Sequence, residues 1–160
     1  MYPYRRLLKA SNGNGMACLS RFPILSVKQI SYVSGNNASF LLKLKMKEDT
    51  LSLVCNHLES NKLDAHDKEV YEGLLKSPNE QKVKSDSKYL LRKLADAVAI
   101  RGPQADSVAQ VISRQSGKYL LVCGDFNDSP ISYAHHTIGK GLTDAYREAG
   151  WGPGFSYNRN

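Results

Sequence analysis

Apolar residues alternate with polar ones, or run continuously, in two blocks that flank a helical middle. Phe40, Leu42, Leu44 and Met46 alternate with more polar positions, which predicts a half-buried strand with one mostly solvated face. Short turns join the strands of the first block and favour an antiparallel meander over a Rossmann-type parallel sheet. The other strands are expected over residues 15–20, 24–33, 51–57 and from residue 119 onward.

Apolar residues at three- and four-residue steps predict helices in the middle of the chain. Asp67 to Lys76 suits a short helix that ends at Ser77-Pro78-Asn79. One stripe runs from about Lys82 to Arg101, and Gly102-Pro103 is expected to break or kink that helix. A second stripe continues toward Gly117, a candidate C′ residue. We expect both stripes to cover one face of a sheet; their residues are Leu90, Leu91, Leu94, Ala95, Val98, Ala105, Val108, Ala109 and Ile112.

The most informative segment is Cys123-Gly-Asp-Phe-Asn-Asp-Ser-Pro130, which follows an apolar run that starts at Tyr119. It predicts a buried strand that stops abruptly with Asp125 and Asn127 at its carboxyl end. Period-two alternation is expected to put these two side chains on the same side of the backbone. A carboxylate beside a carboxamide suits a site that orders a water and a hard cation against phosphate. An Asx-rich turn after a core strand is the alternative interpretation of this segment alone.

A second strand-like run, residues 51–57, also ends in polar residues, namely Asn56, His57 and Glu59. A single histidine at a strand end is usually a structural, hydrogen-bonded imidazole. Two polar strand ends separated by helical sequence are a stronger signal, because neighbouring strands of one sheet bring their ends to the same rim.

With these two segments the chain resembles the endonuclease/exonuclease/phosphatase superfamily of metal-dependent phosphoesterases, and its bacterial members in particular. The order and spacing of the motifs agree over nearly the whole chain. The matching motifs are Gly15 to Ile24 with its Ser-Arg-Phe-Pro-Ile turn, Asn-His-Leu-Glu-Ser at 56–60, Gly-Asp-Phe-Asn-Asp-Ser-Pro at 124–130, Leu142-Thr-Asp-Ala145, and Gly152 to Tyr157.

The resemblance implies an α/β fold, part of a four-layer α/β/β/α sandwich with largely antiparallel sheets. The family also places an asparagine and a Gln-Glu pair before the matched region, and an Arg-x-Asp-Tyr strand and a Ser-Asp-His motif after it. Residues 1–160 lack these motifs, so we expect them to be the central portion of a single domain. We expect this chain alone to be inactive, and poorly soluble because sheet edges and apolar faces are left uncovered.

The resemblance also implies roles for three residues in phosphoester hydrolysis by in-line attack of water. Asp125 matches the aspartate that orients and activates the water. Asn127 matches the asparagine that binds a phosphate oxygen or helps to arrange the metal site. His57 matches the histidine that hydrogen-bonds the phosphate or assists proton transfer near the leaving group. Magnesium is the expected cation, with manganese as an alternative, since the ligands are hard oxygens; the family's glutamate ligand is absent, which leaves Asp125 and Asn127 as candidate contributors.

Two other candidates carry less weight. His135 and His136 are adjacent, so their side chains point apart and make a poor chelating pair. Asp144 matches a common aspartate of the family, for which a helix-capping role is the favoured interpretation.

The chain is basic, with a formal net charge of +7. Such a surface attracts phosphate-rich partners, nucleic acid among them. Helix exteriors are ordinarily charged, however, so the charge alone names no substrate, and DNA, RNA, lipid and inositol phosphates stay open. A non-catalytic remnant of the fold that binds phosphate or nucleic acid is the alternative to a hydrolase.

The cysteines and the hydropathy pattern exclude several classes. Cys18, Cys55 and Cys123 are odd in number and lack CxxC spacing, which argues against a disulfide framework and a zinc site. Buried thiols are expected instead. No apolar stretch approaches the ~20 residues that a membrane span needs, and Met1 is not followed by the apolar region of a secretory signal. The sequence assigns no cellular location.

Overall fold

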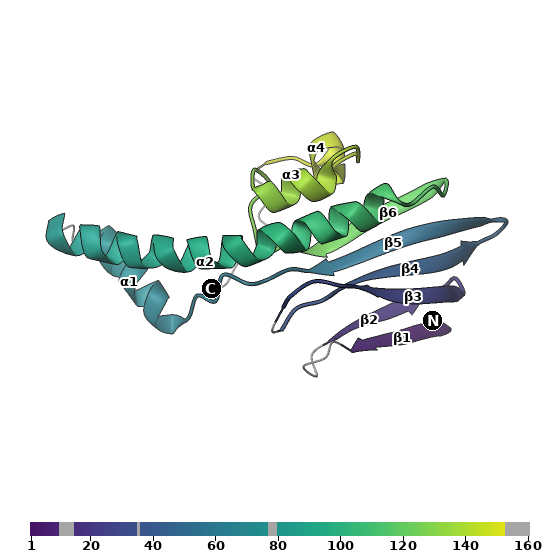
Figure 1. Ribbon diagram of the computed structural model, residues 1–160, viewed down its shortest axis with the longest axis horizontal. Helices are drawn as coiled ribbons and strands as arrows, with labels where there is room; N and C mark the ends of the chain where they lie inside the picture. Colours follow the sequence, from purple (N-terminus) through teal and green to yellow (C-terminus); the bar gives the residue numbers. More distant parts are fainter. Residues whose placement is uncertain (10–14, 35, 77–79, 153–160) are drawn as a thin grey trace.

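The computed structural model describes residues 1–9, 15–34, 36–76 and 80–152, which form six strands and four helices (Figure 1). The strands are β1 (Tyr4–Lys9), β2 (Gly15–Ser20), β3 (Ile24–Ile30), β4 (Ser39–Met46), β5 (Asp49–His57) and β6 (Tyr119–Asp125). The helices are α1 (Ala65–Lys76), α2 (Glu80–Ser113), α3 (Tyr133–Gly139) and α4 (Ala145–Ala149). The expected helix end at residues 77–79 and the motif residues 153–157 lie outside the described residues.

The larger sheet contains four strands in the order β3-β4-β5-β6. β3, β4 and β5 are antiparallel neighbours, which confirms the predicted meander. A two-residue loop joins β4 to β5, because Met46 pairs with Asp49. β6 pairs with β5 in parallel, and the two strands are connected through the helical middle of the chain. The large sheet is therefore antiparallel except at the pair of strands that carries the two polar ends.

Two apolar cores lie on opposite faces of this sheet. The inner core joins Phe40, Leu42 and Leu44 of β4 to Leu8 of β1, and Cys18 of β2 packs against it, so the two-stranded sheet β1-β2 covers that face. The outer core joins the sheet to α2 and α3; its buried residues are Ile30, Val54, Leu58, Ala105, Val108, Ile112, Ala134 and Ile138. Two mostly antiparallel sheets with helices on an outer face confirm the predicted α/β sandwich, and the described residues supply three of its four layers.

The second face of β4 differs from the prediction that it is mostly solvated. Ser39 is fully buried and Leu41 packs against the outer core. Lys43 Nζ donates hydrogen bonds to Ser52 Oγ (2.6 Å) and Gln115 Oε1 (2.8 Å). The lysine stem thus crosses a covered surface while its ammonium group is satisfied by polar partners. The cover is the C-terminal half of α2, which alternation within β4 does not reveal.

Of the break or kink expected at Gly102-Pro103, the break is absent, because α2 runs through these residues and ends at Ser113, before Gly117. A proline inside a helix removes one backbone hydrogen bond and ordinarily kinks or ends the helix. Here the residues on both sides are held in place. Arg101 and Gln104 bond to loops at the edge of the sheet, and Ala105 is fully buried. Tertiary contacts therefore keep the helix continuous.

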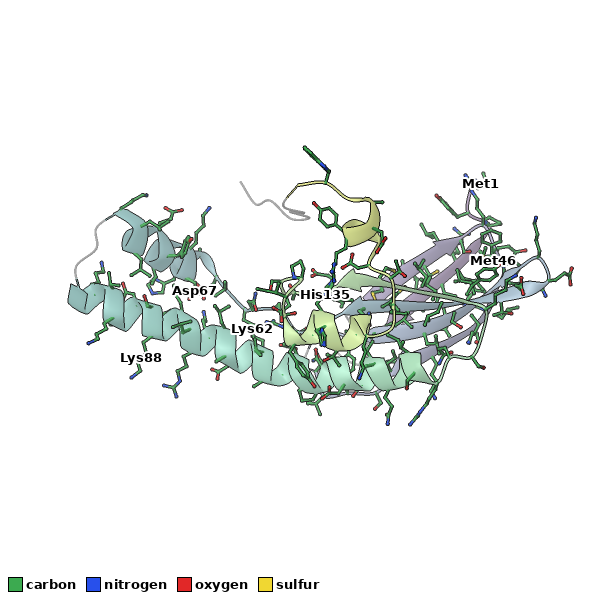
Figure 2. The ribbon with its side chains drawn as sticks, turned by 90° about the horizontal axis from the view of Figure 1, so that it is seen from above. Met1, Met46, Lys62, Asp67, Lys88 and His135 are labelled. Carbon is green, nitrogen blue, oxygen red and sulfur yellow. The ribbon has the colours of Figure 1, made fainter. Side chains whose placement is uncertain are left out.

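The N-terminal half of α2 does not cover the sheet. It projects beyond the sheet together with α1, and we call α1 plus residues 80–96 of α2 the arm (Figure 1). Leu91, in the middle of the predicted stripe, is 65% exposed. Figure 2 shows Asp67 between the two helices of the arm, and Lys62 where the arm joins the rest of the molecule. Only the second of the two predicted stripes is buried against the sheet.

Candidate active site at the ends of β5 and β6

His57 and Asp125 are neighbours on adjacent strands. In the parallel pairing of β5 with β6, His57 stands opposite Asp125 and Asn56 stands opposite Gly124. Both strands end at these residues, and both side chains are exposed. The prediction that the two polar strand ends meet at one rim of a sheet is confirmed.

Gly124 permits this close approach of the strands. A Cβ atom at this position would lie 2.0 Å from the carbonyl oxygen of Asn56 and 2.6 Å from its nitrogen. The residue also has φ +140°, a conformation open to glycine and strained for other residues. The glycine before Asp125 is therefore a geometric requirement of the place where His57 and Asp125 meet.

Asn127 departs from the predicted alternation with Asp125. The strand stops at Asp125, and Asn127 adopts φ 51°, in the left-handed region that asparagine tolerates better than most residues. Its backbone N–H donates to Asp125 Oδ1 (2.9 Å), which closes an Asx turn. The expectation of a shared side on an extended backbone is wrong here. The Asx turn, the alternative interpretation of this segment, is itself part of the site.

A single backbone carbonyl links the two strand ends. Asn127 Nδ2 donates to the Leu58 oxygen at 2.9 Å, and Asn37 Nδ2 donates to the same oxygen at 3.0 Å. The Leu58 N–H in turn donates to the oxygen of Asp125 (3.0 Å). These bonds fix Asn127 relative to the strand that carries His57, although 69 residues separate Asn127 from Leu58.

Cys55 and Cys123 form a register pair two positions before His57 and Asp125. Their Sγ atoms are 4.0 Å apart and both thiols are free. Cys123 is exposed, so the prediction of a buried thiol is wrong for it. The hydrogen bond between the two thiols lowers the pKa of Cys123 to about 7 and raises the pKa of Cys55.

The weaker candidates lie elsewhere. Asp144 accepts hydrogen bonds from the backbone N–H groups of Tyr146 and Arg147 at the start of α4, so the predicted capping role is confirmed. His135 Nε2, on α3, lies 3.5 Å from Asp144 Oδ2, and the imidazole ring packs edge-on against Phe126. These contacts give His135 a packing partner on the residue between Asp125 and Asn127.

Pattern reasoning missed Arg101 and Gln104, two buried polar residues of α2 whose side chains bond to the loops beside the site. A signal for them exists in the sequence. They fall on the same helical face as Ala97, Ala105 and Val108, which are all buried. A positively charged side chain on the buried face of a helix needs hydrogen-bond acceptors around it. An arginine on that face of the sequence pattern therefore indicates a place where polar groups from other segments lie close to the helix.

The described residues fit a magnesium site only in part. Asp125 offers an exposed carboxylate, a hard oxygen donor of the kind that magnesium prefers. Within the part of the chain that the structure describes, no group of three or more His, Cys, Asp or Glu side chains could hold a metal ion. Asp125 is accordingly a candidate for one ligand of a larger set.

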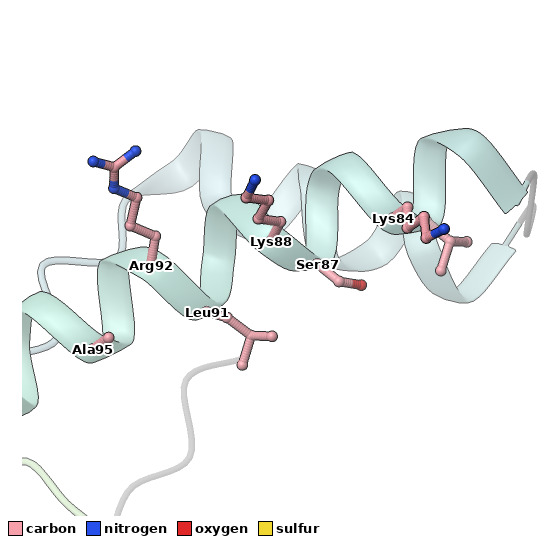
Figure 3. A pocket seen from close by; sticks show the side chains of 7 residues that line it. Lys84, Ser87, Lys88, Leu91, Arg92 and Ala95 are labelled. Atoms are coloured by element: carbon pink, nitrogen blue, oxygen red, sulfur yellow. The ribbon is translucent and has the colours of Figure 1, made fainter.

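A hollow in the surface lies away from this site, on the arm (Figure 3). Its lining comes from α2 alone and includes Lys84, Lys88 and Arg92, spaced four residues apart, beside Leu91. Because one helix supplies every lining residue, the hollow is a basic and apolar helix face rather than an enclosed pocket.

The sequence profile of the Endonuclease/Exonuclease/phosphatase family matches residues 3–160. The chain belongs to this family. No curated protein sequence matches it significantly. Within residues 1–9, 15–34, 36–76 and 80–152, no helix combines the length and hydropathy that crossing a membrane requires.

Solved structures share the fold at low sequence identity. The catalytic domain of human Nocturnin is 15% identical, covers 95% of this chain and 55% of that chain, and gives a TM-score of 0.55. A beta toxin mutant from Staphylococcus aureus with bound magnesium ions is 16% identical, with coverages of 88% and 49% and a TM-score of 0.54. Sphingomyelinase C from Streptomyces griseocarneus is also 16% identical, with coverages of 87% and 48% and a TM-score of 0.51. The chain spans about half the length of the solved structures that it matches.

Proposed function

We propose that this chain is part of a metal-dependent hydrolase of phosphoester bonds, a nuclease or a phosphodiesterase or phosphatase. The observation that carries the proposal is the pairing of His57 with Asp125 at the exposed carboxyl ends of β5 and β6, beside the Asx turn of Asn127. An acid–base pair next to an amide can orient water, transfer protons and donate hydrogen bonds to phosphate oxygens during hydrolysis of a phosphoester. Membership of the family supports the same reaction class.

Asp125 would orient and deprotonate the attacking water. Its Oδ1 accepts the N–H of Asn127, which fixes the rotamer, and the side chain is exposed to water. An oriented carboxylate that accepts a proton in the transition state contributes typically 10²–10⁴-fold to the rate.

His57 and Asn127 would contact the phosphate. His57 stands one strand away from Asp125 with its side chain exposed, so its ring can donate a hydrogen bond to a phosphoryl oxygen or to the leaving group. Asn127 uses one amide hydrogen on the Leu58 oxygen. The other hydrogen can donate to a phosphate oxygen, because a carboxamide has two donors.

Magnesium, or manganese in its place, would polarise the phosphoryl oxygen when bound. Asp125 supplies a carboxylate for such an ion, and Asn127 offers its amide oxygen. The magnesium ions bound to the beta toxin of the same fold support this assignment. We also propose that residues 1–160 are the central portion of a single domain; their coverage of about half of each solved structure supports a domain longer than residues 1–160.

Hydrolysis of bis-p-nitrophenyl phosphate with magnesium tests the proposal, using this chain and the longer protein from its gene. We expect activity in the longer protein, none in this chain, and a fall of about 10²-fold or more on Asp125→Asn. Asp49→Asn is the matched control, because it makes the same change at the opposite end of β5. His57→Ala should also lower the activity, because it removes the proposed contact to phosphate. His136→Ala is its control, since His136 is also exposed but lies on α3.

Two results contradict the proposal. One is hydrolysis of bis-p-nitrophenyl phosphate by the longer protein at a rate that neither Asp125→Asn nor Asp49→Asn changes. The other is no hydrolysis by the longer protein of bis-p-nitrophenyl phosphate, single-stranded or duplex DNA, RNA, or sphingomyelin.

The basic face of the arm, with Lys84, Lys88 and Arg92 exposed together, favours the alternative of a phosphate- or nucleic-acid-binding domain without catalysis. That alternative predicts oligonucleotide binding that weakens with salt and is unaffected by Asp125→Asn. Fluorescence anisotropy at two salt concentrations measures this binding, and salt-dependent binding without hydrolysis of the same oligonucleotide in the presence of magnesium would favour the alternative.

A further inference from the structure

Arg101 places a guanidinium group inside the protein. It lies on α2 and is 2% exposed. A buried charge is costly unless it is paired and hydrogen-bonded. Arg101 meets this condition with three acceptors: Nε donates to Asp128 Oδ2 (3.1 Å), and Nη1 donates to the Glu59 carbonyl oxygen (2.9 Å) and to Asn61 Oδ1 (2.8 Å).

These acceptors belong to the two loops that leave the candidate site. Glu59 and Asn61 follow the end of β5, and Asp128 follows the end of β6. Glu59 is two residues after His57, and Asp128 is the residue after Asn127. One side chain from a third element, α2, therefore bonds to both loops within a few residues of the groups proposed for catalysis.

Gln104, on the same buried helix face as Arg101, extends this connection to a third loop. Its Oε1 accepts the backbone N–H of Glu59 (2.9 Å), and its Nε2 donates to the oxygen of Val33 (3.1 Å), in the connection between β3 and β4. The Glu59 side chain is also buried; it forms an ion pair with Lys62 Nζ (2.8 Å) and accepts a hydrogen bond from Ser34 Oγ (3.2 Å). The backbone of Glu59 is therefore held by α2, and its side chain is held by Lys62 and Ser34.

We infer that Arg101 is a positioning residue, which holds the loop after β5 and the loop after β6 in the arrangement that sets His57 beside Asp125 and Asn127. The catalytic part of this inference rests on the proposed function, whereas the geometric part does not. Arg101 is too deeply buried to touch a substrate. Its effect acts through the position of the loops.

Arginine suits this role better than lysine. The guanidinium donors are arranged in a rigid plane, and here Nε and Nη1 point to separate loops. A lysine has one charged nitrogen on a flexible stem, and it cannot span both loops with the same geometry.

Hydrogen–deuterium exchange and kinetics together test this role in Arg101→Lys, Arg101→Gln and Asp128→Asn. Arg114→Gln is the matched control, because it removes an exposed arginine that directly follows the end of the same helix. We expect amides of residues 58–61 and 126–129 to exchange about tenfold faster or more in the two Arg101 variants. In Asp128→Asn, which keeps the Arg101 bonds to Glu59 and Asn61, we expect this for residues 126–129. Exchange in β4 should be unchanged, since loosening of this kind is local. Asp128→Asn covers the case in which Arg101→Gln does not fold.

In the longer, active protein we expect kcat per folded molecule to fall at least about tenfold with a small change in KM, because sub-ångström misplacement of catalytic groups is costly. Arg101→Lys should recover part of kcat. A purely structural residue would lower the folded fraction and leave kcat per folded molecule unchanged.

The inference is overturned if both loops exchange as in Arg114→Gln, or if exchange rises uniformly over the whole sheet. It is also overturned if the loops loosen while kcat per folded molecule stays the same. If the unaltered protein hydrolyses no phosphoester, the proposed function fails. The exchange data then still decide whether Arg101 sets the positions of the two loops.

Discussion

Gly124 is the residue at which the geometry of the site leaves the least freedom. Its hydrogen atoms face the backbone of Asn56 on the neighbouring strand, at distances that leave no room for a methyl group. Its positive φ turns the chain so that Asp125 follows directly opposite His57. A single backbone position thus combines a close strand approach with an unusual conformation.

Replacement of Gly124 by alanine should therefore destabilise the chain by roughly 3 kcal/mol or more, from the strained conformation together with the steric clash. Urea unfolding measures this loss. Gly73→Ala is the matched control, because Gly73 lies within α1 and a Cβ there meets nothing within 4 Å. That control should stabilise its helix by up to about 1 kcal/mol. Equal midpoints for the two variants would contradict the close approach of β5 and β6.

At the residue scale, the sequence reveals side chains that end strands but not those that reach the site from elsewhere. His57 and Asp125 were predictable because each follows an apolar run and the pairing of two such strands puts them together. Asn127 was placed on an extended backbone, whereas a turn at that point is stabilised by its own N–H. Arg101 was missed because its partners are some 27 to 42 residues away in the sequence, and no local pattern connects them.

At the element scale, α2 shows what periodicity can and cannot predict. Its two apolar stripes were both expected to face a sheet, yet only the second does, since Leu91 is exposed while Val108 is fully buried. The hydrophobic period identifies the face of a helix but not the length of the sheet below it. β1 has no counterpart among the predicted strands, because Leu8 is the one buried residue of its six.

A cluster of charges holds the two helices of the arm together. Lys93 of α2 forms hydrogen bonds with Asp67 (2.5 Å) and Asp64 (3.3 Å), and Asp64 and Asp67 also accept each other's backbone N–H groups. The hydrogen bond from Lys93, followed by the one from the backbone of Asp64, lowers the pKa of Asp67 to about 2 from its ordinary 3.8. The same contact raises the pKa of Lys93.

The arm should consequently open in acid. A carboxylate with a lowered pKa in the folded state contributes stability above its unfolded pKa, and this is lost as pH falls through the folded value. We expect α1 to separate from α2 between about pH 4 and pH 2, as seen by amide exchange of residues 65–76. Lys93→Gln should open the arm already at neutral pH, and Lys88→Gln, on the exposed side of the same helix, should not. An arm that opens at the same pH in both variants contradicts this role for Lys93.

At the scale of the whole molecule, the arm and the body, by which we mean the described residues outside the arm, contribute very differently to stability. Every residue of the two buried apolar clusters lies outside the arm. The two segments that flank the arm lie near each other, because Asn61 Oδ1, before the arm, is 2.8 Å from Arg101 Nη1, after it. The body therefore has its own core and a short gap to bridge where the arm leaves it.

Deletion of residues 64–96, with a short Gly-Ser linker in their place, should leave the body folded. We expect its free energy of unfolding to fall by no more than about 2 kcal/mol, since few apolar contacts are lost. Deletion of residues 133–149 is the contrasting variant, because it removes Ala134 and Ile138 from the outer core, and we expect it to unfold the chain. Thermal unfolding followed by circular dichroism compares them. Loss of structure in the first deletion would show that the arm is part of the body's core.

The parallel pairing of β5 with β6 also determines when the site forms. The meander β3-β4-β5 assembles from strands that are close in sequence, whereas Cys55 and its partner Cys123 are 68 residues apart. Contacts of such long range form slowly because the intervening chain must close first. During synthesis, a nascent chain that has not yet reached residue 119 can form the meander but no site. Until then β5, with His57 at its end, is the edge strand of the meander, and Asp125 joins His57 only when β6 is added to the sheet.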